Sequence, residues 1–254
     1  MPDQTKKTPL LKFLLSCGVM SRRKLVKAVL DGKVTVNKSV VKTPDFPVNP
    51  SKDIVRYKDK ILKQKPKGVA VFYKPAKVLT TLSDPLGRPT VADYLPKTLH
   101  GYFPVGRLDY WSTGLVVLTN DGDLAYHLLH PKFQVSKTYD VKVSGILEEK
   151  DLRKLRKGLI IDKKLIKFDE IKVIQQNGGN TWLRITLHSG ENRVIRKCLE
   201  KIFHPVLKLK RVKMGPFSLK NLIPGELRVL PEKEYIKLKS EIMRKTQNQE
   251  KVAN

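Results

Sequence analysis

The alternation of hydrophobic and polar positions changes partway along the chain. In the first part, apolar residues at helical spacing predict two short helices, Leu10–Leu15 and Arg22–Leu30, with Ser21 as the N-cap of the second. Short alternating stretches after these helices predict strands, at 34–36, 40–41 and 54–57. From Val69 onward the apolar runs are short and rich in β-branched residues, which is typical of strands joined by loops. The pattern predicts an α+β protein built in two parts.

The composition narrows the class of partner. The 254 residues include 51 Lys and Arg against 24 Asp and Glu, so the formal net charge is +27. Hydrophobic residues make up 40% of the chain, which is too many for a disordered basic tail and enough to form a core. No apolar run approaches the roughly 20 residues of a membrane span, and the N-terminus lacks the apolar stretch of a signal peptide. We therefore expect a nucleic acid partner, with a membrane surface attractive only through charge.

The charge and the breaker residues suggest where the chain divides. The first 67 residues carry 17 Lys and Arg against five acidic residues. A polar stretch with Pro and Gly at 63–68 reads as a linker, which predicts a small basic domain at 8–62 and a larger one at 69–240. The end of the chain has few apolar residues and no periodicity, so we expect a disordered tail at 241–254.

The cysteines and histidines do not indicate a metal site. Cys17 and Cys198 are far apart and have no metal-ligand spacing, and each lies in an apolar segment typical of a small buried residue. Free cysteines fit a reducing compartment, so we expect a cytoplasmic protein. The five histidines are scattered, and we expect no metal.

The second predicted helix carries a basic N-terminal turn. Ser21, Arg22, Arg23 and Lys27 lie near its start, where cationic side chains could bind phosphate or could form a solvated face. The surrounding segment, with its leading helix, its G-V-x-S-R-R turn and its G-x-V-x-V-N hairpin, resembles the alpha-L RNA-binding module of the ribosomal protein S-four type. The resemblance covers 8–62 and implies that these four residues contact structured RNA.

One carboxylate stands out in the larger part. Asp109 precedes an apolar run, Leu115–Leu118, which predicts an interior strand followed by a tight turn at 120–122. A single carboxylate in a partly apolar loop could serve as a nucleophile or general base. It could instead cap a turn or pair with Arg107, and the spacing alone favours this alternative.

Five sequence motifs, in a fixed order along the chain, indicate the protein family. The blocks are Tyr73–Pro75 with Thr80–Val91, Val105–Gly122, Lys137–Val143, Ser189–Arg196 and Leu207–Phe217. Their order and spacing resemble the RsuA family of ribosomal RNA pseudouridine synthases (RsuA/RluB-like), over residues 8 to about 235. This resemblance implies a catalytic domain built on a long, mainly antiparallel sheet.

The resemblance also implies roles for individual residues. Asp109 matches the catalytic carboxylate, which must be ionised to act as nucleophile or base. Arg196 matches its partner, although an ion pair with Glu200 at i+4 is an alternative. Tyr139 matches the residue that stacks on the target base and assists proton transfer, although a core aromatic beside Val141 is also plausible.

Further residues follow less directly from the same match. Arg107, Arg193 and Ile195 are expected to bind substrate, with Leu209 or Leu207 as an apolar wall. Three positions depart from the common family pattern: Lys77 replaces a Gly, Val194 a Gln and Lys197 an Arg.

The implied function is isomerisation of a uridine in ribosomal RNA by a monomer that needs no cofactor. The H-P-x-x-x-V-x-K-T-Y segment, His130–Tyr139, favours large-subunit RNA. The alternatives are the same chemistry on small-subunit rRNA or tRNA, and a non-catalytic RNA-binding factor in ribosome assembly.

Overall fold

The computed structural model describes residues 7–253, with side-chain environments up to residue 246, and it divides into two compact units. The first unit contains the chain up to Lys67 together with Leu95–Tyr102, and the second contains Gly68–Tyr94 and everything from Phe103. The break after Lys67 falls inside the range 63–68 that the sequence assigns to a linker. The inclusion of Leu95–Tyr102 in the first unit has no signal in the local sequence.

The first unit packs two helices against short strands. Its helices are α1 (Leu10–Cys17) and α2 (Arg22–Leu30), with a 3-10 turn at Lys97–Leu99. Four strands form one sheet in the order β3-β2-β5-β6: β2 (Val34–Val36), β3 (Ser39–Val40), β5 (Val55–Tyr57) and β6 (Lys60–Ile61). Two more, β1 (Thr8–Pro9) and β4 (Pro47–Val48), pair separately. The apolar stripes that predicted the helices are buried together, with Leu10, Leu25 and Val34 fully shielded from solvent.

The second unit is built on one large sheet. Its main strands follow the order β13-β14-β10-β15-β9-β7-β17, with β8 paired to β9 and β16 to β15. Their bounds are β7 (Val69–Lys74), β8 (Phe103–Val105), β9 (Thr113–Thr119), β10 (Lys137–Ser144), β13 (Glu170–Asn177), β14 (Asn180–Leu187), β15 (Val206–Met214), β16 (Phe217–Ser218) and β17 (Leu227–Val229). Among the described strand pairs of this sheet only β9 and β15 run parallel, which confirms the mainly antiparallel sheet. A separate hairpin joins β11 (Leu159–Ile161) to β12 (Lys164–Ile166).

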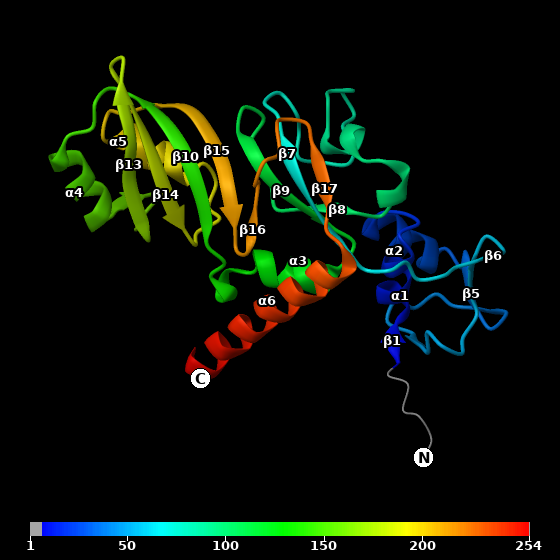
Figure 1. The fold of residues 1–254 in the computed structure, drawn as a ribbon. Coiled ribbons are helices and arrows are strands. Elements are labelled where there is room, and N and C mark those ends of the chain that lie inside the picture. The colour runs from blue at the N-terminus through cyan, green and yellow to red at the C-terminus, as the bar shows by residue number, and fades with distance from the viewer. Residues whose placement is uncertain (1–6, 254) are drawn as a thin grey trace. The chain divides into compact units, whose positions relative to one another are not determined.

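Helices lie on both faces of this sheet (Figure 1). On one face α4 (Glu149–Lys157) and α5 (Val194–Lys201) belong with the cluster that contains Val141 and Leu183. On the other face α3 (Gly122–Leu129) and α6 (Glu232–Ala253) pack with Leu115 and Val117 of β9. Two short 3-10 turns, at Val91–Tyr94 and Pro131–Phe133, complete the unit. No helix in the described range 7–253 is long and apolar enough to cross a membrane.

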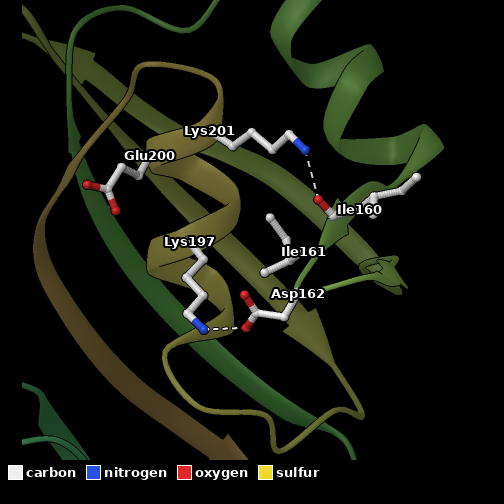
Figure 2. A pocket seen from close by; sticks show the side chains of 6 residues that line it. All are labelled: Ile160, Ile161, Asp162, Lys197, Glu200 and Lys201. Atoms are coloured by element: carbon white, nitrogen blue, oxygen red, sulfur yellow. Dashed lines mark hydrogen bonds and ion pairs between the residues drawn. The ribbon is translucent and has the colours of Figure 1, made fainter.

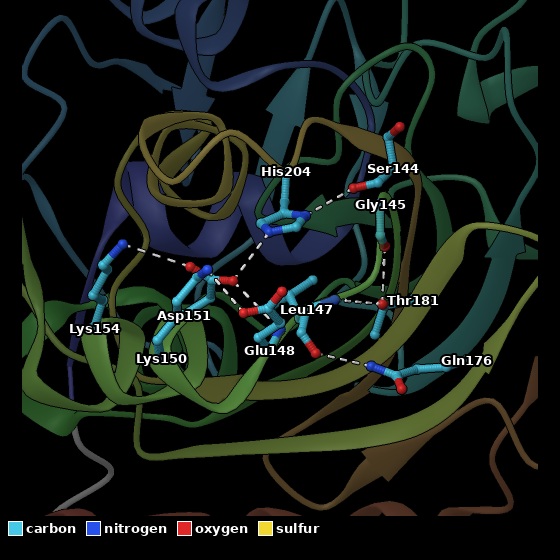
Figure 3. A network of polar contacts seen from close by, with 10 residues as sticks. All are labelled: Ser144, Gly145, Leu147, Glu148, Lys150, Asp151, Lys154, Gln176, Thr181 and His204. Atoms are coloured by element: carbon cyan, nitrogen blue, oxygen red, sulfur yellow. Dashed lines mark hydrogen bonds and ion pairs between the residues drawn. The ribbon is translucent and has the colours of Figure 1, made fainter.

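A network of polar contacts connects the end of β10 with α4, β14 and the segment after α5 (Figure 3). His204 lies with Nδ1 2.9 Å from the Ser144 carbonyl and Nε2 3.4 Å from Asp151. The Thr181 hydroxyl donates to the Gly145 carbonyl at 3.0 Å and accepts from the Leu147 amide at 3.0 Å. These bonds tie the end of β10 to α4 and to the connection between α5 and β15.

Two expectations about local structure are wrong. The residues expected to form a tight turn at 120–122 instead begin α3, where Asp121 is the N-cap and accepts from the Asp123 amide at 3.2 Å. The tail expected to be disordered at 241–254 continues α6 to Ala253, while residue 254 lies outside the described residues. Packing explains the second error, because Ile242 is buried in the same cluster as residues of α3.

Candidate active site

The sheet register brings distant residues into one row. Lys74 pairs with Gly114, Gly114 with Arg211, Arg211 with Tyr139, and Tyr139 with Ile185. These pairs cross β7, β9, β15, β10 and β14 in turn. Directly opposed residues of neighbouring strands project to the same face, so the whole row lies on the α5 face of the sheet.

Gly114 permits the central crossing of that row. Its φ is +103°, and a Cβ added there would lie 2.2 Å from the Arg211 carbonyl oxygen and 2.8 Å from its nitrogen. Real Cβ contacts are never that short, so any side chain would force β9 and β15 apart. The glycine in the S-T-G-L block is therefore required for the parallel strand pair.

Asp109 lies in the loop between β8 and β9, next to this row. Its carbonyl accepts from the Ser112 amide at 3.0 Å, and its side chain is 42% exposed. Oδ2 lies 4.0 Å from Nε of Arg196 and 4.0 Å from Nη1 of Arg193. Two guanidinium groups therefore attract the carboxylate, but both are too far away to donate a hydrogen bond to it. Its oxygens remain accessible to a substrate.

Arg196 is held by α5 in a largely buried position. The helix buries Val194, Ile195, Cys198 and Leu199, and the Arg196 side chain, 15% exposed, lies beside them. Its Nη1 donates to the Val206 carbonyl at 3.2 Å, while Nε is buried with no hydrogen-bond partner. Burial and then the positive charge of Arg193 lower the pKa of this guanidinium, and Asp109 partly opposes the shift. Glu200, the alternative partner, forms no ion pair with Arg196.

Tyr139 projects from β10 on the same face. Its ring packs, partly buried, against the cluster that contains Val141 and Ile185. Its hydroxyl makes no hydrogen bond within the described residues. An apolar ring with an unpaired hydroxyl can both contact a flat base and transfer a proton.

Hydrogen bonds from the segment after β7 hold the loop that carries Asp109 in place. The Thr80 hydroxyl donates to the Leu108 carbonyl at 2.9 Å and accepts from the Leu108 amide at 3.2 Å. The Lys77 amide donates to the Tyr110 carbonyl at 2.8 Å. Lys77, which departs from the family's glycine, adopts a φ of +63° and lies 5.5 Å from the Trp111 ring centroid. Lys77 therefore holds a left-handed conformation that glycine adopts more easily.

Two buried cations in the row were not predicted as site residues. Lys74 is fully buried and donates to the Pro75 and Val78 carbonyls at 2.8 Å each. Burial lowers its pKa to about 8, against the opposing charge of Asp109. Arg211, 2% exposed, donates from Nε to the Leu115 carbonyl at 2.7 Å, and its Nη2 is buried without a partner. A cation that ends a continuous apolar run is the signal that could have identified Lys74.

The remaining predicted residues are placed as follows. Arg107 is exposed and forms no ion pair with Asp109, while Ile195 is 4% exposed within the core cluster. Leu209 is buried, and Leu207 is 52% exposed. The four residues expected to contact RNA belong to the first unit and are all exposed on α2 or just before it: Ser21, Arg22, Arg23 and Lys27.

A hollow in the second unit lies elsewhere, beside α5 (Figure 2). There Lys197 pairs with Asp162, and Lys201 donates to the Ile160 carbonyl at 2.8 Å. Lys197, which departs from the family's arginine, therefore joins α5 to the β11–β12 hairpin. No group of three or more His, Cys, Asp or Glu side chains suited to a metal ion occurs in the described part of the chain.

The fold and the arrangement of charged side chains fit an enzyme that acts on RNA. An accessible carboxylate in the loop before β9 lies 4.0 Å from two guanidinium groups at the start of α5, and a separate unit presents a basic helix. Comparison with known families agrees: residues 68–201 match the RNA pseudouridylate synthase model, and residues 8–54 match the S4 domain. The chain belongs to the RNA pseudouridylate synthase family.

Individual relatives support that assignment over nearly the whole chain. An RNA pseudouridine synthase of Aquifex aeolicus is 39% identical over 89% of this chain and 92% of its own length. The ribosomal large subunit pseudouridine synthase B of Bacillus subtilis is 35% identical over 91% of this chain and 95% of its own. A crystal structure of a pseudouridylate synthase superposes with a TM-score of 0.64 at 25% identity, covering 91% of this chain and 99% of that one.

Proposed function

We propose that the protein converts a specific uridine of large-subunit ribosomal RNA into pseudouridine, with Asp109 as the catalytic carboxylate. The observation that carries the proposal is the position of Asp109, 42% exposed and 4.0 Å from both Arg193 and Arg196. The reaction breaks the bond between ribose and the ring nitrogen, turns the uracil and rejoins it through carbon five. Every atom of the nucleotide is retained, so the balance needs no oxidant, reductant or energy source.

The neighbouring side chains have complementary tasks. Arg196, fixed through its bond to the Val206 carbonyl, attracts the carboxylate and limits its rotation. Tyr139 provides a ring for the uracil and an unpaired hydroxyl for proton transfer at carbon five. Arg193 and Arg107 are exposed and suit phosphate groups on either side of the target nucleotide.

The substrate class rests on the relatives and on the first unit. Relatives from Bacillus subtilis and Salmonella typhi carry the name ribosomal large subunit pseudouridine synthase B. The exposed residues Arg22, Arg23 and Lys27 suit contacts with the backbone of folded RNA. Taking a uridine out of its stack costs a few kcal/mol, which such phosphate contacts offset. A monomer that works in the cytoplasm, where ribosomal RNA is assembled, completes the proposal.

The decisive experiment measures pseudouridine in an unmodified large-subunit rRNA transcript. Wild-type protein should form it, and Asp109→Asn should form none above the background without enzyme. Glu200→Gln is the matched control, because it removes an exposed carboxylate from the same helix as Arg196 and should retain activity. Equal product from wild type and Asp109→Asn would refute the role of Asp109.

Two further results separate the alternatives. Mapping pseudouridine in rRNA and tRNA from cells that lack the protein identifies the target, and a lost site outside large-subunit rRNA would contradict the substrate. Wild-type protein that binds rRNA but forms no pseudouridine would favour a non-catalytic assembly factor. RNA contact by α2 is tested by Arg22→Gln with Arg23→Gln, which leaves the first unit whole, including Leu95–Tyr102.

A further inference from the structure

The second unit presents a sheet surface that the catalytic site does not use. Across β14, β10 and β15, Trp182 pairs with Lys142 and Lys142 with Lys208. The next row crosses β13, β14, β10 and β15. It consists of Lys172, Arg184, Asp140 and Lys210. We call the six cationic and aromatic members of these rows the basic face: Lys142, Lys172, Trp182, Arg184, Lys208 and Lys210.

The basic face lies on the side of the sheet opposite Tyr139. Lys142 alternates along β10 with Val141 and Val143, which are fully buried against the α5 cluster, so its side chain projects the other way. Figure 1 shows α5 behind these strands and no helix in front of β10, β13 and β14. The surface is therefore open, and it is distinct from the site around Asp109.

The charges on this face are not balanced internally. Asp140 accepts from Arg184 at 2.8 and 3.1 Å and lies 3.8 Å from Lys210, while Lys172 pairs with Glu170. Lys142 and Lys208 are direct cross-strand partners, so their positive charges face each other. Neither forms an ion pair within the described residues. Like charges directly opposite each other destabilise a sheet. A polyanion bound across them would remove that repulsion.

Trp182 adds a second feature that suits nucleic acid. Its side chain is only partly buried and stands next to Lys142 rather than within either core cluster. Exposed aromatic rings on a basic sheet stack on unpaired bases, while neighbouring lysines contact the backbone. Strands are about 4.8 Å apart, so a base on Trp182 and phosphates over Lys142 and Lys208 would belong to neighbouring nucleotides.

We propose that the basic face binds an unpaired segment of the RNA substrate, with a base stacked on Trp182 and phosphates held by Lys142 and Lys208. The identity of the RNA as the enzyme's own substrate rests on the proposed function, whereas binding of unpaired RNA to the face does not. The contact lies outside the catalytic site and supplies affinity rather than chemistry.

The fluorescence of Trp182 tests the stacking directly. The chain contains two tryptophans, Trp111 and Trp182, so Trp111→Phe leaves Trp182 as the single reporter. Adding single-stranded oligouridylate should quench its emission in a saturable and salt-sensitive way. Trp182→Ala should weaken binding of the same oligonucleotide by roughly 5- to 150-fold, the range of one lost base–aromatic stack.

Charge removal tests the phosphate contacts. The double variant Lys142→Gln with Lys208→Gln should lower the slope of log affinity against log salt by about 1.4, or about 0.7 for each contact to a single strand. The matched control, Lys157→Gln with Lys167→Gln, removes two exposed lysines outside the basic face and should not change the slope. Both variants should fold, since Lys142→Gln relieves a repulsion, and circular dichroism checks this.

With rRNA as substrate, the Lys142→Gln, Lys208→Gln variant should have a higher KM than the wild type and the same kcat. Absence of Trp182 quenching would overturn the inference. So would an affinity and a salt slope of the Lys142→Gln, Lys208→Gln variant that equal those of the control variant. That result would leave an acidic protein segment as the occupant. Failure of wild type to form pseudouridine would refute the proposed function alone, because the fluorescence and salt measurements need no turnover.

Discussion

The attachment of α6 to the sheet depends on one buried carboxylate. Asp121 is fully buried, and its Oδ2 accepts from the Tyr235 hydroxyl at 2.6 Å and the Lys239 ammonium at 2.5 Å. Its Oδ1 accepts from the Asp123 amide as the N-cap of α3. Asparagine caps helices as well as aspartate does, so Asp121→Asn keeps the cap and weakens the contacts to α6.

The size of the effect follows from those contacts. Each hydrogen bond to a charged group contributes about 1.5–3 kcal/mol, and the asparagine amide would bring N–H donors toward two other donors. Lys239 is 26% exposed and recovers part of its solvation, so the expected loss of unfolding free energy is about 3 kcal/mol. For a chain of this size that corresponds to a fall in Tm of roughly 6–12 °C.

Urea unfolding and limited trypsin digestion measure the two consequences. Asp121→Asn should lower the unfolding midpoint and expose α6 to cleavage, while Tyr235→Phe should cost about 1 kcal/mol. In the Asp121→Asn background, Lys239→Met should cost less than in wild type, because the two side chains interact. A change below about 0.5 kcal/mol for Asp121→Asn, with α6 still protected, would refute this account.

Three other substitutions test the site. Gly114→Ala should destabilise the protein by more than about 4 kcal/mol and abolish activity, because its Cβ would overlap the Arg211 backbone; a stable, active variant in thermal unfolding would contradict the register. Lys77→Gly should raise the unfolding free energy by about 0.5–1 kcal/mol, by relieving the left-handed conformation, and a lower midpoint would argue against strain. Lys74 has a pKa of about 8 in the folded state and an ordinary one when unfolded, so the unfolded state binds more protons between these values. The unfolding free energy of the wild type should therefore rise by up to about 3 kcal/mol, relative to that of Lys74→Met, between pH 8 and about 10.5. Parallel plots of unfolding free energy against pH for the two proteins would show that burial does not lower the pKa of Lys74.

Much of the fold could be predicted from local sequence. The helices and hairpin of the first unit follow from apolar spacing and from Asn37 and Lys38, which form the turn between β2 and β3 at φ +49° and +73°. The family and the mainly antiparallel sheet followed from the ordered blocks, and both are confirmed. The structure places Arg196 within 4.0 Å of Asp109, although the roles of both residues remain predictions.

The rest depends on contacts between residues far apart in the chain. Nothing near Arg211 indicates that its strand lies parallel to β9, because a register is set by tertiary pairing. The helical tail depends on the packing of Ile242 with residues of α3, and the helix before it is bonded to Asp121, 118 residues before Lys239. Arg211 could therefore not be predicted as a member of the site, since its burial follows only from the assembled sheet, whereas Lys74 at the end of its apolar run had a local signal.

The parallel pairing of β9 with β15 also constrains how the enzyme is made. In the sheet, β15 lies between β10 and β9, although both of those strands precede it in the chain. Until residues near Arg211 have been synthesised, β10 lacks a neighbour along one edge, and β9, which pairs with β8 at Val117–Thr119, is unpaired on that side only at Thr113 and Gly114. The site around Asp109 is therefore completed late in synthesis, because long-range pairing must wait for the distant strand. Incomplete chains would carry the basic N-terminal unit without a functional catalytic centre, and their open edges would favour aggregation.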